Sequence, residues 1–273
     1  MEQYKSRWGE IPQTVEEHVN MIMGRYMETG DVFKCFDPKI GIFPYPKYLE
    51  GLLKDNNWDR LNNLIYQENC VQSLSSLMNT DTQSRYWAFL EMLEALAVGN
   101  IKTLELLLPN KIENVTHIFP LYRPAVNMLI GLWRKDNSVL DYAVPRAEKF
   151  VSGKRPQWER ATVAYLLALY DKKPKEAGIQ LELMCKGVMR TDFDDDRDKT
   201  LCVPAHGLYQ LAACLWDEEL FRQLPMPNHK IFSKKYAIWR NTQNVQPELF
   251  AKYPEPIIND VLINPDSELV KQN

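Results

Sequence analysis

Apolar side chains recur at steps of three and four residues in one segment of this chain after another, and this repetition limits what the chain can fold into. Such spacing places the apolar residues on one face of a helix. The segments that show it begin near residues 11, 82, 157 and 204. The pattern predicts an all-α protein in which helix exceeds half of the residues, and the presence of only 11 glycines agrees with it.

Short polar turns separate the predicted helices. Four of them follow an apolar block, at Asn100, Asp136, Asp171 and Asp217, which lie 36, 35 and 46 residues apart. Stacked αα-hairpins need about 34 to 47 residues per unit. We therefore expect residues 1–224 to form a domain of stacked, antiparallel, repeat-like helical hairpins.

Residues 225–273 differ in character, because they contain six of the chain's prolines. Proline breaks long helices, so this segment is expected to be a largely irregular C-terminal extension that packs on the helical domain. Within it, residues 235–239 are interpreted as a short strand or extended arm. Residues 34–46 are expected to form a loop for the same reason.

The helical stripes also predict core positions. The side chains expected to be mostly buried are Trp87, Leu90, Leu93, Leu166, Leu169, Leu211 and Leu215. Cys185 and Cys214 lie in apolar helical runs and are assigned to the core as well.

Charge, cysteine content and hydropathy narrow the functional classes. The formal net charge is −3, whereas a nucleic-acid-binding protein usually carries a basic excess. Five cysteines without a CxxC pair indicate reduced thiols rather than a disulfide framework or a zinc site. No segment resembles a signal peptide or approaches the roughly 20 apolar residues of a membrane span. We expect a cytoplasmic protein with neither nucleic acid nor membrane as a partner.

Catalytic motifs are absent from the sequence. There is no glycine-rich nucleotide loop, no GxSxG elbow and no HExxH helix. Cys202 lies four residues before His206 and could form a nucleophile–base pair with it, but sequence proximity supplies neither an oriented base nor an oxyanion site. The sequence therefore predicts a non-enzymatic protein without cofactor or metal.

Two charged segments are candidates for binding. The first is acidic and contains Asp192, Asp194, Asp195, Asp196 and Asp198. Three interpretations stay open for it: a solvated loop, a loop that contacts a basic partner, and a calcium loop. The calcium pattern fails at its sixth and twelfth positions, which are Arg197 and Val203.

The second charged segment is basic. Glu148 and Glu159 offset its cations, so it is interpreted as an ordinary helix–loop surface. Its members are Arg146, Lys149, Lys154, Arg155 and Arg160.

Three helical blocks, at residues 87–100, 158–170 and 204–212, resemble the immunity protein 49 family of bacterial polymorphic toxin systems. The resemblance implies an all-helical protein that binds and neutralises a cognate toxin inside the producing cell, and it implies no catalytic residues. The five aspartates of the acidic segment are the candidate contact residues. The alternatives are a helical-repeat adaptor that binds a protein or peptide and an enzyme with an unrecognised site at Cys202.

Overall fold

The computed structural model describes residues 14–36, 45–78, 82–112, 115–191, 197–243 and 246–266. Helix accounts for 72% of the structure, and the described ranges contain no strand, which confirms the all-α prediction. The chain divides into two compact units, called here unit 1 (residues 1–80 and 246–273) and unit 2 (residues 81–245). These units differ from the two segments expected from the sequence, 1–224 and 225–273, and that division stays a prediction.

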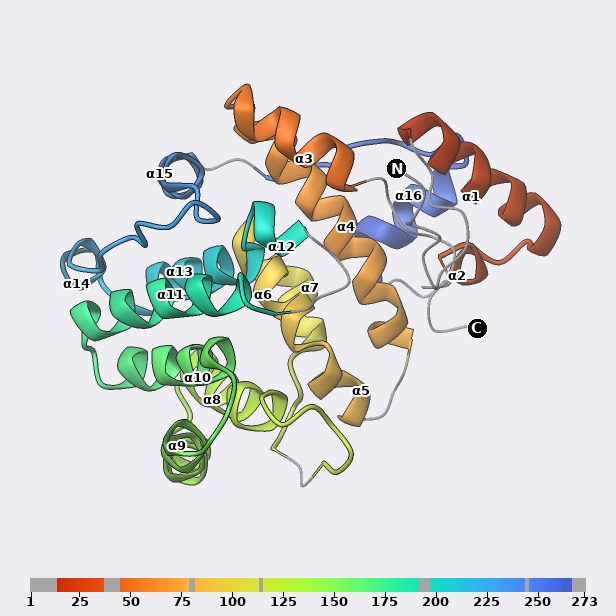
Figure 1. Cartoon of the computed structure of the whole chain (residues 1–273). Helices are drawn as coiled ribbons and strands as arrows, with labels where there is room; N and C mark the ends of the chain where they lie inside the picture. Colours follow the sequence, from red (N-terminus) through yellow and green to blue (C-terminus); the bar gives the residue numbers. More distant parts are fainter. Residues whose placement is uncertain are drawn as a thin grey trace. The chain divides into compact units, whose positions relative to one another are not determined.

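In its described residues, unit 1 contains four helices from the first part of the chain and one from its C-terminal part. Thr14 caps the first helix by accepting a hydrogen bond from the backbone N–H of Glu17, and Gly30 ends it in the left-handed conformation, with φ of 65°. The helices are α1 (Val15–Thr29), α2 (Val32–Cys35), α3 (Tyr45–Lys54), α4 (Trp58–Met78) and α16 (Pro256–Ile263) (Figure 1).

Tyr253 connects the C-terminal segment of unit 1 to α1 and α4 through its hydroxyl group. Its hydroxyl lies 2.8 Å from Nε2 of His18 on α1 and accepts a hydrogen bond of 3.2 Å from Nε2 of Gln67 on α4. Oε1 of Gln67 accepts a further bond, of 2.7 Å, from the backbone N–H of Ala251. All three polar side chains are buried, so each of them needs these partners.

Unit 2 contains the remaining helices. Three of the four polar turn residues identified in the sequence cap helices: Asn100 caps α7, Asp136 caps α9 and Asp217 caps α14. The helices are α5 (Thr82–Trp87), α6 (Phe89–Val98), α7 (Ile101–Leu107), α8 (Tyr122–Arg134), α9 (Asn137–Ser152), α10 (Gln157–Tyr170), α11 (Pro174–Val188), α12 (Arg197–Thr200), α13 (Val203–Leu215), α14 (Glu218–Arg222) and α15 (Lys234–Thr242).

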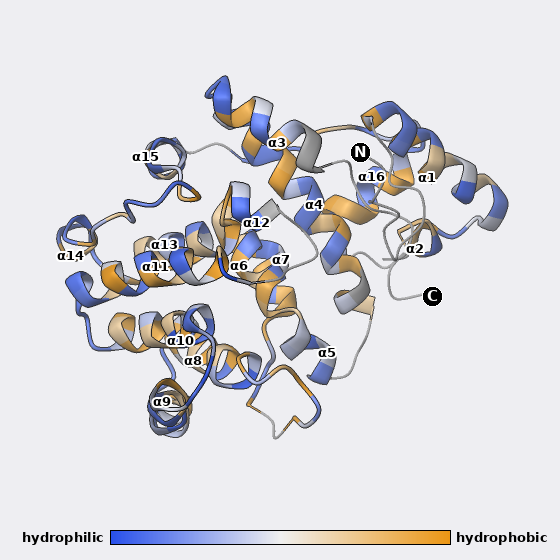
Figure 2. Cartoon of the chain, in the orientation of Figure 1, coloured by the Kyte–Doolittle hydropathy of each residue, from blue (hydrophilic) through white to orange (hydrophobic). Residues whose placement is uncertain are grey.

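Two packing relationships build the core of unit 2. The consecutive helices α8, α9, α10 and α11 each pack on the next, as in helical hairpins (Figure 1). The apolar helix α13 instead packs on α6, more than a hundred residues earlier in the chain (Figure 2). Gly207 permits this close approach, because a β-carbon there would overlap the backbone of Leu93. A repeat-like stack throughout the unit is not confirmed.

Most of the predicted core positions are buried. Leu93, Leu166, Leu169 and Leu211 are each no more than 2% exposed, and Cys185 is fully buried. Leu90 and Leu215 are half-buried, which agrees with the expectation that they are mostly buried. Two other assignments were wrong, because Cys214 is exposed and the Trp87 side chain is 47% exposed.

The helix that was expected to follow Asp81 is interrupted at Ala88, and this break accounts for the exposed tryptophan. Ala88 separates α5 from α6. Trp87 consequently does not continue the buried stripe of α6, and its ring instead packs edge-on against Tyr122, with centroids 5.7 Å apart.

One segment expected to be extended is helical, and the expected loop at residues 34–46, of which 37–44 lie outside the described residues, is helical at both ends. Residues 235–239 lie within α15, where Ser233 accepts a hydrogen bond from the backbone N–H of Tyr236 and so caps the helix. The expected loop at residues 34–46 overlaps the end of α2 and the start of α3. Among the described residues, no helix is both long and apolar enough to cross a membrane.

Candidate functional site

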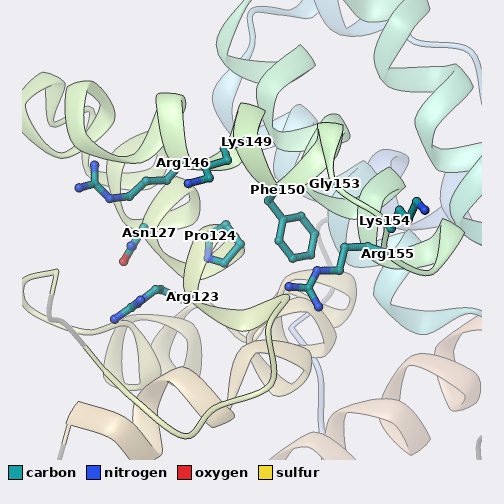
Figure 3. Close-up of a pocket in the computed structure, with 9 residues that line it drawn as sticks. All are labelled: Arg123, Pro124, Asn127, Arg146, Lys149, Phe150, Gly153, Lys154 and Arg155. Carbon is teal, nitrogen blue, oxygen red and sulfur yellow. The ribbon is translucent and has the colours of Figure 1, made fainter.

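A cavity of about 560 Å³ opens in unit 2 between the start of α8 and the C-terminal half of α9 (Figure 3). Its volume lies in the range of small-molecule sites, about 300 to 1,000 Å³. Three residues come from α8, three from α9 and three from the turn between α9 and α10. They are Arg123, Pro124, Asn127, Arg146, Lys149, Phe150, Gly153, Lys154 and Arg155.

Helical spacing brings these side chains together. Arg146, Lys149 and Phe150 are three and four residues apart, so they share one face of α9. Arg123 and Asn127 are likewise four residues apart on α8. Because α8 packs against α9, the two faces line a common space. Lys149 also lies in the last turn of α9, where the helix dipole favours a cation.

Five of the nine lining residues are Arg or Lys, and none is acidic. Within the described part of the chain, Arg146, Lys149, Lys154 and Arg155 form no ion pair with a carboxylate. Like charges held near one another repel and raise the free energy of the folded state. The cavity therefore favours a ligand that brings negative charge.

Aromatic contacts hold two of the arginines in place. The Arg146 guanidinium carbon lies 3.5 Å from the ring centroid of Tyr142, and its Nη1 donates a 2.8 Å hydrogen bond to the Tyr142 carbonyl. The Arg155 guanidinium lies over the Phe150 ring at 5.5 Å. These cation–π contacts limit the freedom of both side chains, so less ordering is needed when a ligand binds.

Asn127 is a neutral polar residue of the lining. It is 1% exposed, and its Oδ1 accepts a 2.5 Å hydrogen bond from the hydroxyl of the fully buried Tyr86. This bond fixes the orientation of the amide. The five cations of the lining are hydrogen-bond donors only, which suits a ligand rich in acceptors.

Glu159 is buried and is not the surface charge that the sequence suggested. It is 4% exposed rather than on the surface, and its Oε2 has no hydrogen-bond partner among the described residues. Burial raises the pKa of this carboxyl group, and nearby Arg155 partly offsets the rise. Burial also raises the pKa of Tyr122, with smaller contributions from the charges of Glu91 and Glu159.

The acidic segment predicted to bind a partner is mostly untested. Asp192, Asp194, Asp195 and Asp196 lie outside the described residues. Asp198 is half-buried in the first turn of α12. In the ranges that the structure describes, no group of three or more His, Cys, Asp or Glu residues is arranged to hold a metal ion.

Cys202 and His206 do not form a nucleophile–base pair. Cys202 is fully buried, and a hydrogen bond with Cys185 together with burial raises the pKa of its thiol well above the usual value. A nucleophilic cysteine needs a lowered pKa and access to solvent. Nε2 of His206 accepts a bond from the backbone N–H of Ser233, and its ring stacks on Phe232 at 4.1 Å. The histidine therefore packs against Phe232 in the protein interior.

The structure brings together four of the five residues in the basic segment and leaves Arg160 outside the cavity. Sequence reasoning missed Arg123, which is 23 residues from Arg146, although its i, i+4 relation to Asn127 was visible. The four residues of the basic segment were identified in the sequence, but the sequence did not show that they line one cavity. No protein-family model, curated protein or solved structure matches this chain.

Proposed function

We propose that this protein is a non-enzymatic binding protein and that the cavity between α8 and α9 binds a compact polyanion. One observation carries the proposal: five cationic side chains line one cavity that contains no carboxylate. The chain as a whole has a net charge of −3, so this positive charge is local rather than part of a generally basic surface. A short, multiply charged ligand fits such a site better than a long polyanion.

The lining also supports binding rather than catalysis. None of its nine residues is Ser, Thr, Tyr, Cys, His, Asp or Glu, the side chains that most often act as nucleophile or general base. Arg, Lys and Asn side chains can hold and orient an anion through charge-assisted hydrogen bonds without transforming it.

The test uses inorganic tripolyphosphate as a probe in isothermal titration calorimetry at fixed ionic strength. We expect binding that weakens as salt is added, because exposed charges are screened. Lys149→Gln and Arg155→Gln should each weaken it about tenfold, since each removes a charge-assisted contact. Arg160→Gln is the matched control, because it removes an exposed charge from the same segment outside the cavity. Absence of binding, or equal losses in all three variants, would contradict the proposal.

A second proposal, independent of the cavity, is that the protein is an immunity protein that neutralises a cognate toxin. Its support is the sequence resemblance of the three helical blocks, together with the five aspartates between residues 192 and 198. Opposed charges speed the encounter of two proteins. A variant with Asp194, Asp195 and Asp196 changed to Asn should associate more slowly with a basic toxin encoded beside it and lose much of the salt dependence. Unchanged association kinetics at low salt would remove the acidic segment from the proposal.

A further inference from the structure

We infer that the polyanion bound in the cavity is a nucleoside polyphosphate, whose phosphate chain contacts the cations and whose base stacks on Phe150 and Arg155. This inference rests on the proposed function and adds a chemical class to it. It combines the charge density of the lining, the aromatic surface beside that charge, and the size of the cavity.

Charge density favours phosphate over carboxylate. Five cations border about 560 Å³, and four of them form no ion pair with a described carboxylate. A triphosphate chain concentrates about four negative charges on a few connected atoms, whereas an acidic peptide spreads single charges over several residues. Guanidinium groups such as those of Arg123 and Arg155 bind phosphate oxygens in a bidentate manner.

The apolar part of the lining favours a ligand that carries a ring. The half-buried side chain of Phe150 lines the cavity near Pro124, and the labelled cations surround these two rings in Figure 3. A guanidinium is planar and stacks on bases as an aromatic ring does. Because Arg155 lies over Phe150 at 5.5 Å, the pair offers an extended stacking surface. Lys149, one residue before Phe150, and Lys154, four residues after it, line the same cavity.

The limits of the basic area argue against a polynucleotide. The cations are confined to residues 123–155, and Asp141 and Glu148 are exposed on the same helix as Arg146 and Lys149. A long strand would extend beyond the cavity and meet these negative charges. The lining also has no carboxylate to accept a hydrogen bond from a base amino group, so the inference concerns the class of ligand and not one base.

The experiment compares adenosine triphosphate with inorganic tripolyphosphate on the full-length chain, by titration calorimetry without divalent cations. Adenosine triphosphate should bind at least about fivefold more tightly, because base stacking adds to the phosphate contacts. Phe150→Leu keeps an apolar side chain but removes the ring. It should remove most of this difference. Tripolyphosphate affinity should fall much less, and only because Arg155 loses the ring that orders it.

The outcomes separate the inference from the function on which it rests. If both ligands bind equally and Phe150→Leu changes both affinities alike, the nucleoside part fails and the anion site stands. If neither binds, the proposed function fails as well. Tighter binding of hexa-aspartate or of a single-stranded oligonucleotide than of adenosine triphosphate would overturn the inference in favour of an acidic peptide or a nucleic acid. Circular dichroism melting of Phe150→Leu shows whether the variant is folded, and Ile179→Leu, at a 57% exposed position away from the cavity, is its control.

Discussion

The hydroxyl group of Tyr86 donates a 2.5 Å hydrogen bond to Oδ1 of Asn127, so a fully buried residue of α5 sets the orientation of an amide that lines the basic cavity. The bond connects the stability of unit 2 with the geometry of its candidate site. Removing the donor should therefore affect both.

Tyr86→Phe should lower the free energy of unfolding by about 1 to 2 kcal/mol, because it leaves the buried Oδ1 of Asn127 without its donor. The freed amide can rotate, so tripolyphosphate affinity should also fall. Urea denaturation and titration calorimetry measure the two effects. Tyr170→Phe makes the same chemical change at a position that is 41% exposed and should alter neither quantity. Equal stabilities of the two variants would contradict the assigned role of the bond.

Gly99→Ala should destabilise unit 2 more than its backbone conformation alone requires. Gly99 has φ of 77°, where an L side chain costs about 1 to 2 kcal/mol, and a β-carbon there would also overlap the guanidinium of Arg240. Gly30→Ala is the control, since it has φ of 65° but open space around the added atom. In a double-mutant cycle, Arg240→Ala should recover the excess loss of Gly99→Ala. An additive cycle would show that the guanidinium moves aside freely.

Leu93→Ala and Leu211→Ala should each cost about 2 to 5 kcal/mol, because both side chains are fully buried in helices that pack on each other. Leu215→Ala, on the same helix as Leu211 but half-buried, should cost clearly less. Thermal melting of the three variants tests this order. Unchanged melting temperatures for the first two would mean that the α6–α13 contact is assigned wrongly.

His206 should make the protein less stable as the pH falls. Burial lowers the pKa of its imidazole from 6.5 to about 3, so the folded protein keeps it neutral while the unfolded chain takes up a proton. Its contribution is fully present above pH 6.5 and is lost as the pH falls from about 6.5 towards 3, with a slope of up to about 1.4 kcal/mol per pH unit. His206→Gln should flatten the curve of unfolding free energy in this window. His117→Gln, at an exposed position, is the control.

The helices of this fold were predictable from the sequence because the interactions that form them are local. Apolar spacing and polar caps such as Asn100 and Asp136 act within a few residues, so the helices and many of their ends were predictable. The aromatic residues at 235–239 suggested a strand because tyrosine and tryptophan favour strands when context is ignored. The cap at Ser233 and the burial of Tyr236 in unit 2 determined a helix instead.

The candidate site was less predictable, because it depends on which helices meet. The spacing of Arg146, Lys149 and Phe150 on one face could be read from the sequence, but the position of Arg123 opposite them could not. Glu159 looked like a neutralising surface charge until its burial was known. The packing of α6 on α13 is equally non-local. Gly207 permits the close approach of the two helices, but a glycine in a helix does not by itself identify the helix that packs against it.

The hydrogen bonds of Tyr253 bear on the order in which the chain acquires its structure. Unit 1 consists of residues that precede unit 2 in the sequence and residues that follow it. His18 and Gln67 therefore leave the ribosome long before Tyr253, whose hydroxyl group contacts both of them. During synthesis all the residues of unit 2 are therefore available before unit 1 has its last helix. Until residue 253 emerges, His18 and Gln67 lack their contacts with the Tyr253 hydroxyl, so unit 1 cannot reach its final structure until after unit 2 has been synthesised.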